Sequence, residues 1–504
     1  MLWLVLSVLC ACLCAYLGEW WWRVVYRGGY WARRGVPHLK PHPLLGSLTW
    51  LQKKNAALWF REMYDRFRYP YVGIWLFWRP ALIINSQDIA RRVLVKDSDN
   101  FRNRLISSGS HDSVGGLNVF TLNDPTWTVI RRPLTAVFTG AKLRAMHAFV
   151  ASKSQELVER LIVEMKSGKF IDLRSVYSDF STDVIGTSSF GLKNDATRTG
   201  DSPIRLMTKE FMKFDVIRGL AWSTIFFLPE LVKVFRFSFF PKVTTDYFEK
   251  LWKQMVAQRG GYDAHIANTR DLLDCLIKIK QEANKSGQVD ISEEMLVAQA
   301  VVFIQAGFDT SAVTLTYTTY ELAFQPLIQE RLYSELQETK RKLGVTYFDD
   351  KTLADLPYLN AVIKETLRKY PPLGWLDRVA KSDYQIDEKL KIKAGTPIYV
   401  NAIGLHYDPE LFPKPDEYDP SRFLPENEHN LQPYSFMPFG EGPRHCIGMR
   451  FAYQTVRSAL AHVVYAFQFR PLPDSPLPNS CVPDKRGLLF MPSDPMSVQF
   501  VLRE

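Results

Sequence analysis

The chain has 504 residues, of which 46% are hydrophobic and 13% aromatic, and its formal net charge is +10. Its length would suit about three ordinary domains, but no repeat or low-complexity break follows residue 46, so one large unit with a single core is expected. The charge fits an evenly basic surface as well as attraction to anionic lipid or to an acidic partner. No run of five like charges marks a nucleic-acid tail, so nucleic acid is not an expected partner.

The N-terminus predicts a membrane anchor. Residues 1–18 carry no charge, tryptophans occupy 20–22, and arginines follow from Arg23. About 17 to 25 apolar residues cross a bilayer, tryptophans settle at its interface, and basic residues stay in the cytosol. We therefore expect a transmembrane signal-anchor over 1–22 and a cytosolic body. The alternative is a cleaved signal peptide, but a basic n-region and a clear cleavage site are missing.

A basic, proline-rich stretch follows the expected anchor. Pro37, Pro41 and Pro43 cannot continue a helix, so residues 23–46 are predicted to be a stiff hinge that holds the body, residues 47–504, at the membrane. The six cysteines include no Cys-x-x-Cys pair, which excludes a zinc site of that kind and fits a reducing compartment.

A pair that shares one helix face is expected near residue 127. Trp127 and Arg131 are spaced i, i+4 just after Asp124-Pro125, a plausible helix start. A donor indole and a cation on one face would suit a carboxylate.

A long central helix is predicted from about residue 290 to Ala323. Asp290 or Ser292 can cap it, the following residues are mostly apolar, and Pro326 stops it. Such a helix must be buried on most sides. It contains Ala306-Gly-Phe-Asp309-Thr310, in which a helix-interior glycine costs about 1 kcal/mol against alanine. An acid and a hydroxyl here could deliver protons to a bound oxygen species, and Gly307 is expected to leave room for that ligand.

Two further charged motifs follow. Glu365 and Arg368 are spaced i, i+3, so they can pair on one face of a helix. Pro420-Ser-Arg422-Phe lies downstream and could supply a third member.

Cys446 is the most distinctive residue of the chain. It lies in a turn with Gly440, Gly442 and Gly448, which allow close approach of a flat ligand, and an apolar helical run follows. The end of that helix should favour the thiolate. The neighbouring His445 is expected to be exposed or structural, because adjacent side chains on one turn rarely reach one metal.

The pattern Phe439-x-x-Gly442-x-Arg444-x-Cys446-x-Gly448 resembles the haem-thiolate signature of cytochrome P-450 enzymes. The Ala-Gly-x-Asp-Thr, Glu-x-x-Arg and Pro-x-Arg-Phe motifs resemble others of that family, with a serine at 421 where the family often has glutamate. The resemblance covers nearly the whole chain. Residues 183–191, 370–373 and 376–378 look like the insect microsomal branch that is tied to xenobiotic metabolism.

The resemblance implies a mainly α fold with small β-sheets, a single large haem domain and haem b (iron protoporphyrin IX) between the central helix and the cysteine loop. It makes Cys446 the axial ligand of the haem iron and assigns proton delivery to Asp309 and Thr310. Further haem-binding residues would be Arg104, Trp127, Arg131, Arg378, Phe439, Arg444 and Gly448. Structural support would come from Glu365, Arg368 and Arg422.

The implied activity is a monooxygenase reaction on a lipophilic xenobiotic, hormone or lipid at the endoplasmic reticulum membrane. Electrons would come from NADPH through NADPH-cytochrome P-450 reductase, with cytochrome b5 as a further candidate partner, since the chain has no dinucleotide-binding Gly-x-Gly-x-x-Gly. The aromatic segment 220–240 would be either a core helix or a lid that dips into lipid.

Two alternatives stay open. A haem-thiolate isomerase or dehydratase would need no external electrons, and a non-catalytic haem carrier or sensor would need no proton relay. The presence of both Asp309 and Thr310 favours oxygen activation.

Overall fold

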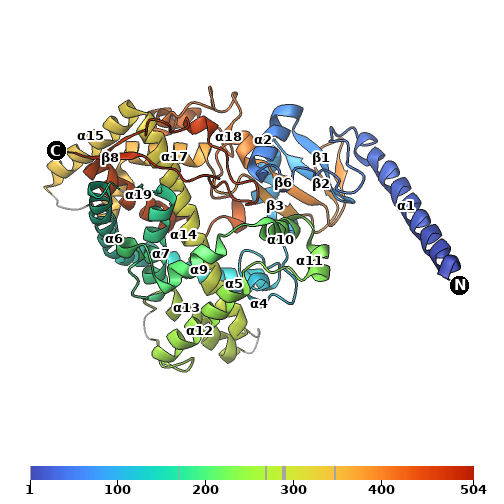
Figure 1. Ribbon diagram of the computed structural model, residues 1–504, viewed down its shortest axis with the longest axis horizontal. Helices are drawn as coiled ribbons and strands as arrows, with labels where there is room; N and C mark the ends of the chain where they lie inside the picture. Colours follow the sequence, from blue (N-terminus) through green and yellow to red (C-terminus); the bar gives the residue numbers. More distant parts are fainter. Residues whose placement is uncertain (1, 169, 267–268, 287–290, 345–347, 504) are drawn as a thin grey trace.

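Helix α14 (Glu293–Phe324) forms the centre of the protein. The computed structural model describes residues 2–168, 170–266, 269–286, 291–344 and 348–503. Figure 1 shows α14 running through the body, and several of the other helices pack against it. By length and hydropathy α14 could span a membrane, but 78% of its apolar window is buried inside the protein. The predicted buried central helix and the mainly α fold are confirmed.

The ends of α14 follow from its sequence. The Ser292 side chain accepts a hydrogen bond from the Met295 N–H at 3.2 Å, and Glu293 and Glu294 occupy the first turn. The alternative cap, Asp290, lies outside the described residues. The helix ends at Phe324, and Pro326 begins the next helix because proline is tolerated at a first position.

Helices account for most of the body. Those before α14 are α2 (Ala56–Phe67), α3 (Gln87–Arg91), α4 (Ser113–Gly116), α5 (Thr126–Leu134), α6 (Gly140–Lys166), α7 (Leu173–Phe190), α8 (Ala196–Thr199), α9 (Pro203–Phe211), α10 (Val216–Phe227), α11 (Pro229–Phe235), α12 (Lys242–Gln258) and α13 (Leu272–Ser286). Those after it are α15 (Pro326–Leu343), α16 (Asp350–Asp355), α17 (Pro357–Lys369), α18 (Ala402–His406) and α19 (Met449–Ala466).

Short π and 3-10 turns join these helices. They are η1 (Arg92–Lys96), η2 (Ser98–Asn100), η3 (Thr135–Phe138), η4 (Pro420–Phe423), η5 (Pro425–Asn430), η6 (Gly442–Arg444) and η7 (Pro478–Ser480).

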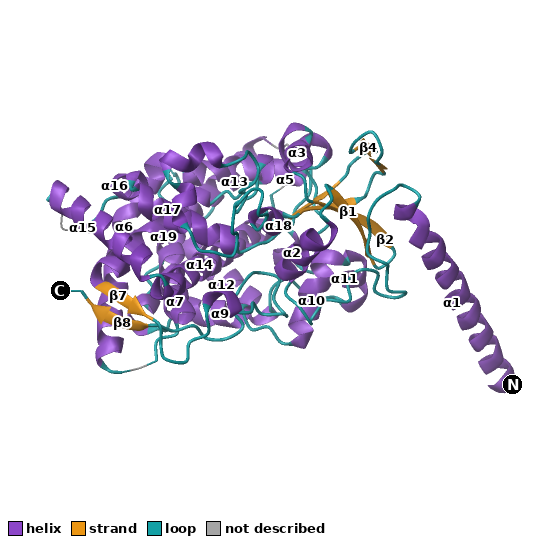
Figure 2. Ribbon diagram, turned by 90° about the horizontal axis from the view of Figure 1, so that it is seen from above, coloured by secondary structure: helices purple, strands orange, loops and turns teal. Residues whose placement is uncertain are grey.

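Small sheets lie at opposite ends of the body (Figure 2). The larger has the order β1 (Tyr71–Leu76), β2 (Arg79–Ile84), β6 (Pro397–Val400), β3 (Leu376–Val379). Its β2–β6 pair is parallel and the other two pairs are antiparallel. Two-stranded sheets pair β4 (Tyr384–Gln385) with β5 (Lys391–Ile392) and β7 (Phe467–Arg470) with β8 (Gln499–Leu502).

Helix α1 (Leu2–Ala32) projects from the end of the body that carries β1 and β2 (Figures 1 and 2). It continues past the predicted boundary at residue 22. Trp31 near its end is fully buried, and its Nε1 donates to the Ile74 carbonyl at 3.1 Å. A Cβ at Gly73 would lie 2.5 Å from the Trp31 ring, so only glycine admits the indole here.

The expected hinge is joined to the sheet as well. The Gly73 N–H donates to the Pro37 carbonyl at 2.8 Å, and the Ser47 N–H donates to the Trp75 carbonyl at 2.7 Å. Residues 37–47 therefore run along β1, and the stiff hinge stays a prediction.

The aromatic segment 220–240 is divided between core and surface. Trp222, Phe226 and Phe239 are buried, which fits the core interpretation, whereas Leu220 and Phe235 are exposed. The buried side chains support the core interpretation for most of this segment, and contact of the exposed ones with lipid stays a prediction.

Candidate functional site

A cavity of about 320 Å³ lies between α14 and the loop 438–448 that leads into α19. It collects residues from distant parts of the chain. The predicted site residues that line it are Arg104, Trp127, Arg131, Asp309, Thr310, Phe439, Arg444, Cys446 and Gly448. Arg378 is not among the lining residues. The remaining wall is mostly aliphatic or aromatic.

The loop around Cys446 is held by its own backbone. The Cys446 N–H donates to the Phe439 carbonyl at 2.8 Å, and α19 begins at Met449. The Cys446 side chain is exposed to the cavity rather than to bulk solvent. Burial raises the pKa of its thiol, and the Gly448 N–H and Arg131 offset only part of this effect. The Gly448 N–H at the start of α19 lowers the pKa as expected but is outweighed by burial, whereas a bound metal ion would deprotonate the sulfur outright.

Two glycines of this loop have different roles. Gly442 has φ +73°, and a Cβ there would overlap the Leu94 carbonyl oxygen of η1, so this glycine lets the loop pack against protein. A Cβ at Gly448 would meet nothing within 4 Å. Close approach of a flat ligand is therefore possible at Gly448, while Gly442 serves packing.

Arginines gather at one side of the cavity. The Arg444 guanidinium lies 4.2 Å from the Trp127 ring centroid, and its Nη2 donates to the Leu122 carbonyl at 2.7 Å. Its Nη1 is buried without a partner in the described part of the chain. Arg131 Nη2 donates to the His445 carbonyl at 2.8 Å. The predicted Trp127–Arg131 pair thus faces the cavity together with Arg444.

These cations lack enough negative charge nearby. Burial, followed by repulsion from Arg104 and Arg378, lowers the pKa of Arg444 to about 8. Burial and Arg104 lower the pKa of Arg378 to about 9, and its Nη1 donates to the Asp377 carbonyl at 2.7 Å. The nearby carboxylate, Asp377, lies 3.8 Å from Arg104 Nε. An anionic ligand bound here would relieve this repulsion.

The Glu365–Arg368 pair is formed and fully buried. The Glu365 carboxylate accepts from Arg368 Nε at 2.7 Å and from Nη2 at 2.8 Å. Arg422 Nε lies 3.5 Å from Glu365 Oε1, so the Pro-Ser-Arg-Phe segment joins the pair. The Asp419 N–H also donates to this carboxylate at 2.9 Å.

His406 connects this pair to the loop, and the sequence analysis did not identify it. Arg368 Nη1 donates to the His406 carbonyl at 2.8 Å, and His406 Nδ1 lies 3.1 Å from the Arg368 carbonyl. The Met437 N–H donates to His406 Nε2 at 3.0 Å. Since Nε2 must accept and Nδ1 must donate, the ring is neutral, and burial lowers its pKa to about 3. We call Glu365, Arg368 and His406 the brace.

Asp309 and Thr310 present two different polar groups to the cavity. Thr310 Oγ1 donates to the Ala306 carbonyl at 2.7 Å. Asp309 Oδ1 accepts from Arg174 Nη2 at 3.4 Å, while Oδ2 is buried without a partner among the described residues. Burial raises the pKa of Asp309, and Arg174 and Arg205 offset only part of this shift.

Gly307 lines the cavity, as expected of a residue that leaves room for a ligand, and it also faces α7. A Cβ at this position would lie 2.7 Å from side-chain carbons of Ile185 on α7. The missing side chain therefore allows α7 and α14 to pack closely just before Asp309.

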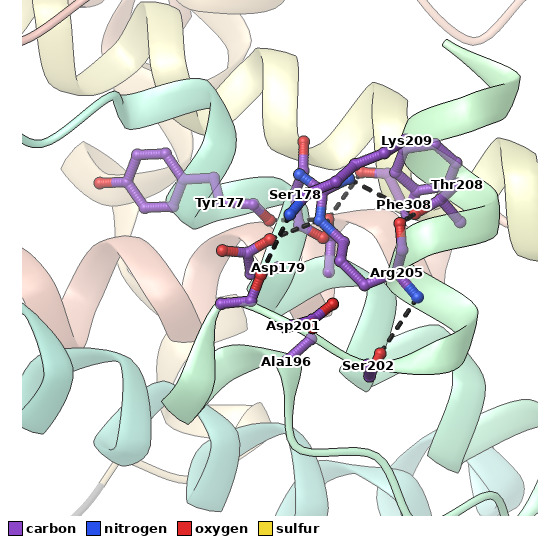
Figure 3. Close-up of polar contacts among 12 residues, drawn as sticks. Tyr177, Ser178, Asp179, Ala196, Asp201, Ser202, Arg205, Thr208, Lys209 and Phe308 are labelled. Carbon is purple, nitrogen blue, oxygen red and sulfur yellow. Dashed lines mark hydrogen bonds and ion pairs between the residues drawn. The ribbon is translucent and has the colours of Figure 1, made fainter.

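A buried charge cluster fixes α7 and α9 beside this point (Figure 3). Asp179 accepts from Arg160 Nη1 at 2.8 Å and also from Arg205 Nε. Two residues on, Ser181 Oγ donates to the Phe308 carbonyl at 2.7 Å. Sequence reasoning missed this cluster because its members are far apart along the chain and match no short motif.

Comparison with known proteins gives a consistent result. The family model described as Cytochrome P450 matches residues 36–500. Cytochrome P450 6k1 of Blattella germanica is 35% identical over 470 residues, which cover 89% of this chain and 88% of the relative. Cytochrome P450 6a2 of Drosophila melanogaster is 34% identical over 458 residues, covering 87% of this chain and 89% of the relative. These similarities agree with the resemblance to the insect branch.

Proposed function

Because the chain belongs to the cytochrome P450 family, it is a haem-binding monooxygenase, and we propose that it oxidises lipophilic small molecules with electrons from NADPH. When bound, haem supplies an iron centre that activates O₂, so that one oxygen atom enters the substrate and the other leaves as water. The mostly aliphatic and aromatic cavity wall supports a lipophilic substrate. Xenobiotics are the proposed class, with hormones and lipids as alternatives.

The residues around the cavity fit a haem group. The Cys446 sulfur would bind the iron, and Phe439 and Gly448 would contact the flat ring. The arginine cluster would hold the two propionates, because the unpartnered Arg444 Nη1 and the mutual repulsion of the arginines call for anions. Arg104, Trp127 and Arg131 would contribute from the cavity wall. Arg378 would act from behind it, through the charge it adds to the cluster.

Proton delivery is assigned to the α14 pair. The Thr310 hydroxyl would hand a proton into the cavity, and Asp309 would resupply it. The raised pKa of Asp309 brings its proton closer to physiological pH, which suits a donor. Asp309 and Thr310 line the same cavity as Cys446. This is the observation that favours a monooxygenase over an isomerase, a dehydratase or a haem carrier.

The electron donor is a separate protein in this proposal. The chain has no dinucleotide-binding glycine motif, and its net charge of +10 is compatible with an acidic partner. NADPH-cytochrome P450 reductase is the proposed donor, with cytochrome b5 as a second.

We place the enzyme on the endoplasmic reticulum membrane, with its body in the cytosol. Apolar side chains of α1 such as Leu9 and Leu13 are exposed, and so are Val216, Ile217 and Phe235 of α10 and α11. Removal of residues 1–22 should therefore weaken sedimentation with lipid vesicles without abolishing it. A fully soluble product would contradict a second contact through α10 and α11.

The carbon monoxide difference spectrum of the reduced protein tests the central assignment. We expect the red-shifted absorption of a thiolate-bound ferrous carbonyl, and we expect Cys446→His to shift it to that of an imidazole-bound iron. NADPH-dependent product formation with the reductase then separates the monooxygenase from its alternatives. Product formed without NADPH would support an isomerase.

A further inference from the structure

Part of the cavity is walled by a group of nearly parallel aromatic rings. Trp222 and Phe239 have centroids 4.9 Å apart with planes at 28°, and Trp222 and Phe226 lie 5.8 Å apart at 22°. All three side chains line the cavity. Such a wall offers dispersion contact to flat, lipophilic molecules and almost no hydrogen bonding.

Helix α14 brings polar side chains into the same cavity, and most of them are already paired. Thr310 and Thr314 donate to carbonyls one turn earlier, at 2.7 and 2.9 Å, and Asp309 pairs with Arg174. Gln305 and Ser311 also line the cavity, and neither has a hydrogen bond within the described residues. A serine hydroxyl can turn back to its own helix, as the threonines do. Gln305 carries both an amide donor and an amide acceptor and is the larger unpaired group.

This unpaired amide should favour ligands that can hydrogen-bond to it over ligands that cannot. While water fills the cavity, it can satisfy the Gln305 amide, but a bound lipophilic molecule displaces that water. A ligand without a polar group would then leave the amide buried and unpaired, and sites of this kind reject analogues that lack the matching group. The arginines that line the cavity belong to the proposed propionate site, so a neutral group is favoured over a carboxylate.

We propose that Gln305 selects for flat, lipophilic substrates that carry one neutral oxygen function, such as a ketone, ester or hydroxyl group. A carbonyl oxygen accepts from the Gln305 amide N–H, and a hydroxyl donates to its carbonyl. This inference rests on the proposed monooxygenase function, because it names the substrate class of that same cavity. Gln305 acts here on substrate choice and orientation, and the chemistry stays with Asp309 and Thr310.

The test uses a pair of ligands that differ in one group. Fluorenone and fluorene have similar flat ring systems, but only fluorenone has a carbonyl. Each is titrated into the purified, haem-loaded full-length protein, and binding is followed by the spin-state change in the absorption spectrum. We expect fluorenone to bind about five- to tenfold tighter, the range of one neutral hydrogen bond. Gln305→Leu should bring the ratio close to one and tighten fluorene binding.

Ser311→Ala is the matched control, because Ser311 is the other unpaired side chain on the cavity face of α14; it should keep the preference. Equal binding of the two ligands by the wild type, or an unchanged ratio in Gln305→Leu, would overturn the inference. So would loss of the preference in Ser311→Ala alone. Gln305→Met supplies a second variant if the leucine variant does not fold. The carbon monoxide spectrum of each sample is recorded as well. If the proposed function is wrong, the wild type should lack the thiolate-type absorption. If only the role of Gln305 is wrong, that absorption should be present.

Discussion

The brace beneath the Cys446 loop and the cavity face of α14 treat buried polar groups in different ways. Glu365, Arg368 and His406 are fully buried, and their side chains make hydrogen bonds within the protein. On α14, the buried Asp309 Oδ2 has no partner among the described residues, and the half-buried Gln305 lines the cavity without a hydrogen bond to them. The difference follows from what each region does. The brace must hold the Cys446 loop in one position, so its polar groups are paired within the protein. The cavity face of α14 would meet substrates and protons, so some of its polar groups stay unpaired.

Glu365→Ala should disturb the brace more than any other change proposed for it. This change leaves the buried Arg368 cation without its carboxylate, and breaking one partner of a buried ion pair costs roughly 3–5 kcal/mol. We expect purified protein with little bound haem, measured as the ratio of haem to protein. Glu417→Ala is the control, because the Glu417 side chain is 62% exposed and only its carbonyl contacts Arg368. Normal haem content in Glu365→Ala would argue against the brace.

His406→Phe should have the next largest effect. It keeps an aromatic ring but removes the bonds to the Arg368 carbonyl and the Met437 N–H, so the ion pair loses its link to the loop. We expect haem to bind while a large part of the carbon monoxide spectrum changes to the form of a haem without a thiolate ligand. His462→Phe, which replaces another histidine of low pKa, on α19, should keep the thiolate form. The same spectrum for both variants would show that the link is not specific.

Thr310→Ala tests the cavity face of α14. Removal of the hydroxyl should disturb proton delivery but not haem binding, so the ratio of product formed to NADPH consumed should fall several-fold. General acid catalysis by one side chain is worth about 10²- to 10⁴-fold at most. Thr314→Ala, one turn further on the same face, should change this ratio much less. Unchanged coupling in Thr310→Ala would rule out a relay through that hydroxyl.

Asp309→Asn should give the smallest effect, and its sign depends on pH. Because burial raises the pKa of Asp309 in the folded protein, the acid contributes most to stability below its ordinary pKa of 3.8, and this contribution is lost as the pH rises through the folded pKa. The amide variant should therefore have a slightly higher Tm than the wild type at neutral pH. The gain should shrink as the pH falls towards the ordinary carboxyl value. A lower Tm at neutral pH would mean that the Arg174 contact outweighs burial.

Much of the architecture could be predicted from local patterns. The cap at Ser292, the stop at Pro326 and the Glu365–Arg368 spacing depend on residues close in sequence, and each has the expected form. The helix after Cys446 also begins where the turn ends, at Met449. Periodicity and caps act over one or two turns, so the sequence carries these features directly.

The rest depends on contacts between distant segments. His406 lies 38 residues from Arg368 and 31 from Met437, so no short motif marks it. Arg174 meets Asp309 across 135 residues. The burial of Arg378 outside the cavity lining, and the packing roles of Gly307 and Gly442, likewise follow from neighbours that only the folded chain brings near.

The fit of Trp31 against Gly73 has a consequence for how the enzyme would meet its substrates. The buried Trp31 indole fixes the end of the N-terminal helix to the sheet. The body therefore cannot rotate freely relative to that helix. Once that helix is embedded, its tilt would set which side of the molecule rests on the bilayer. Compounds dissolved in lipid would then always meet the same side of the protein.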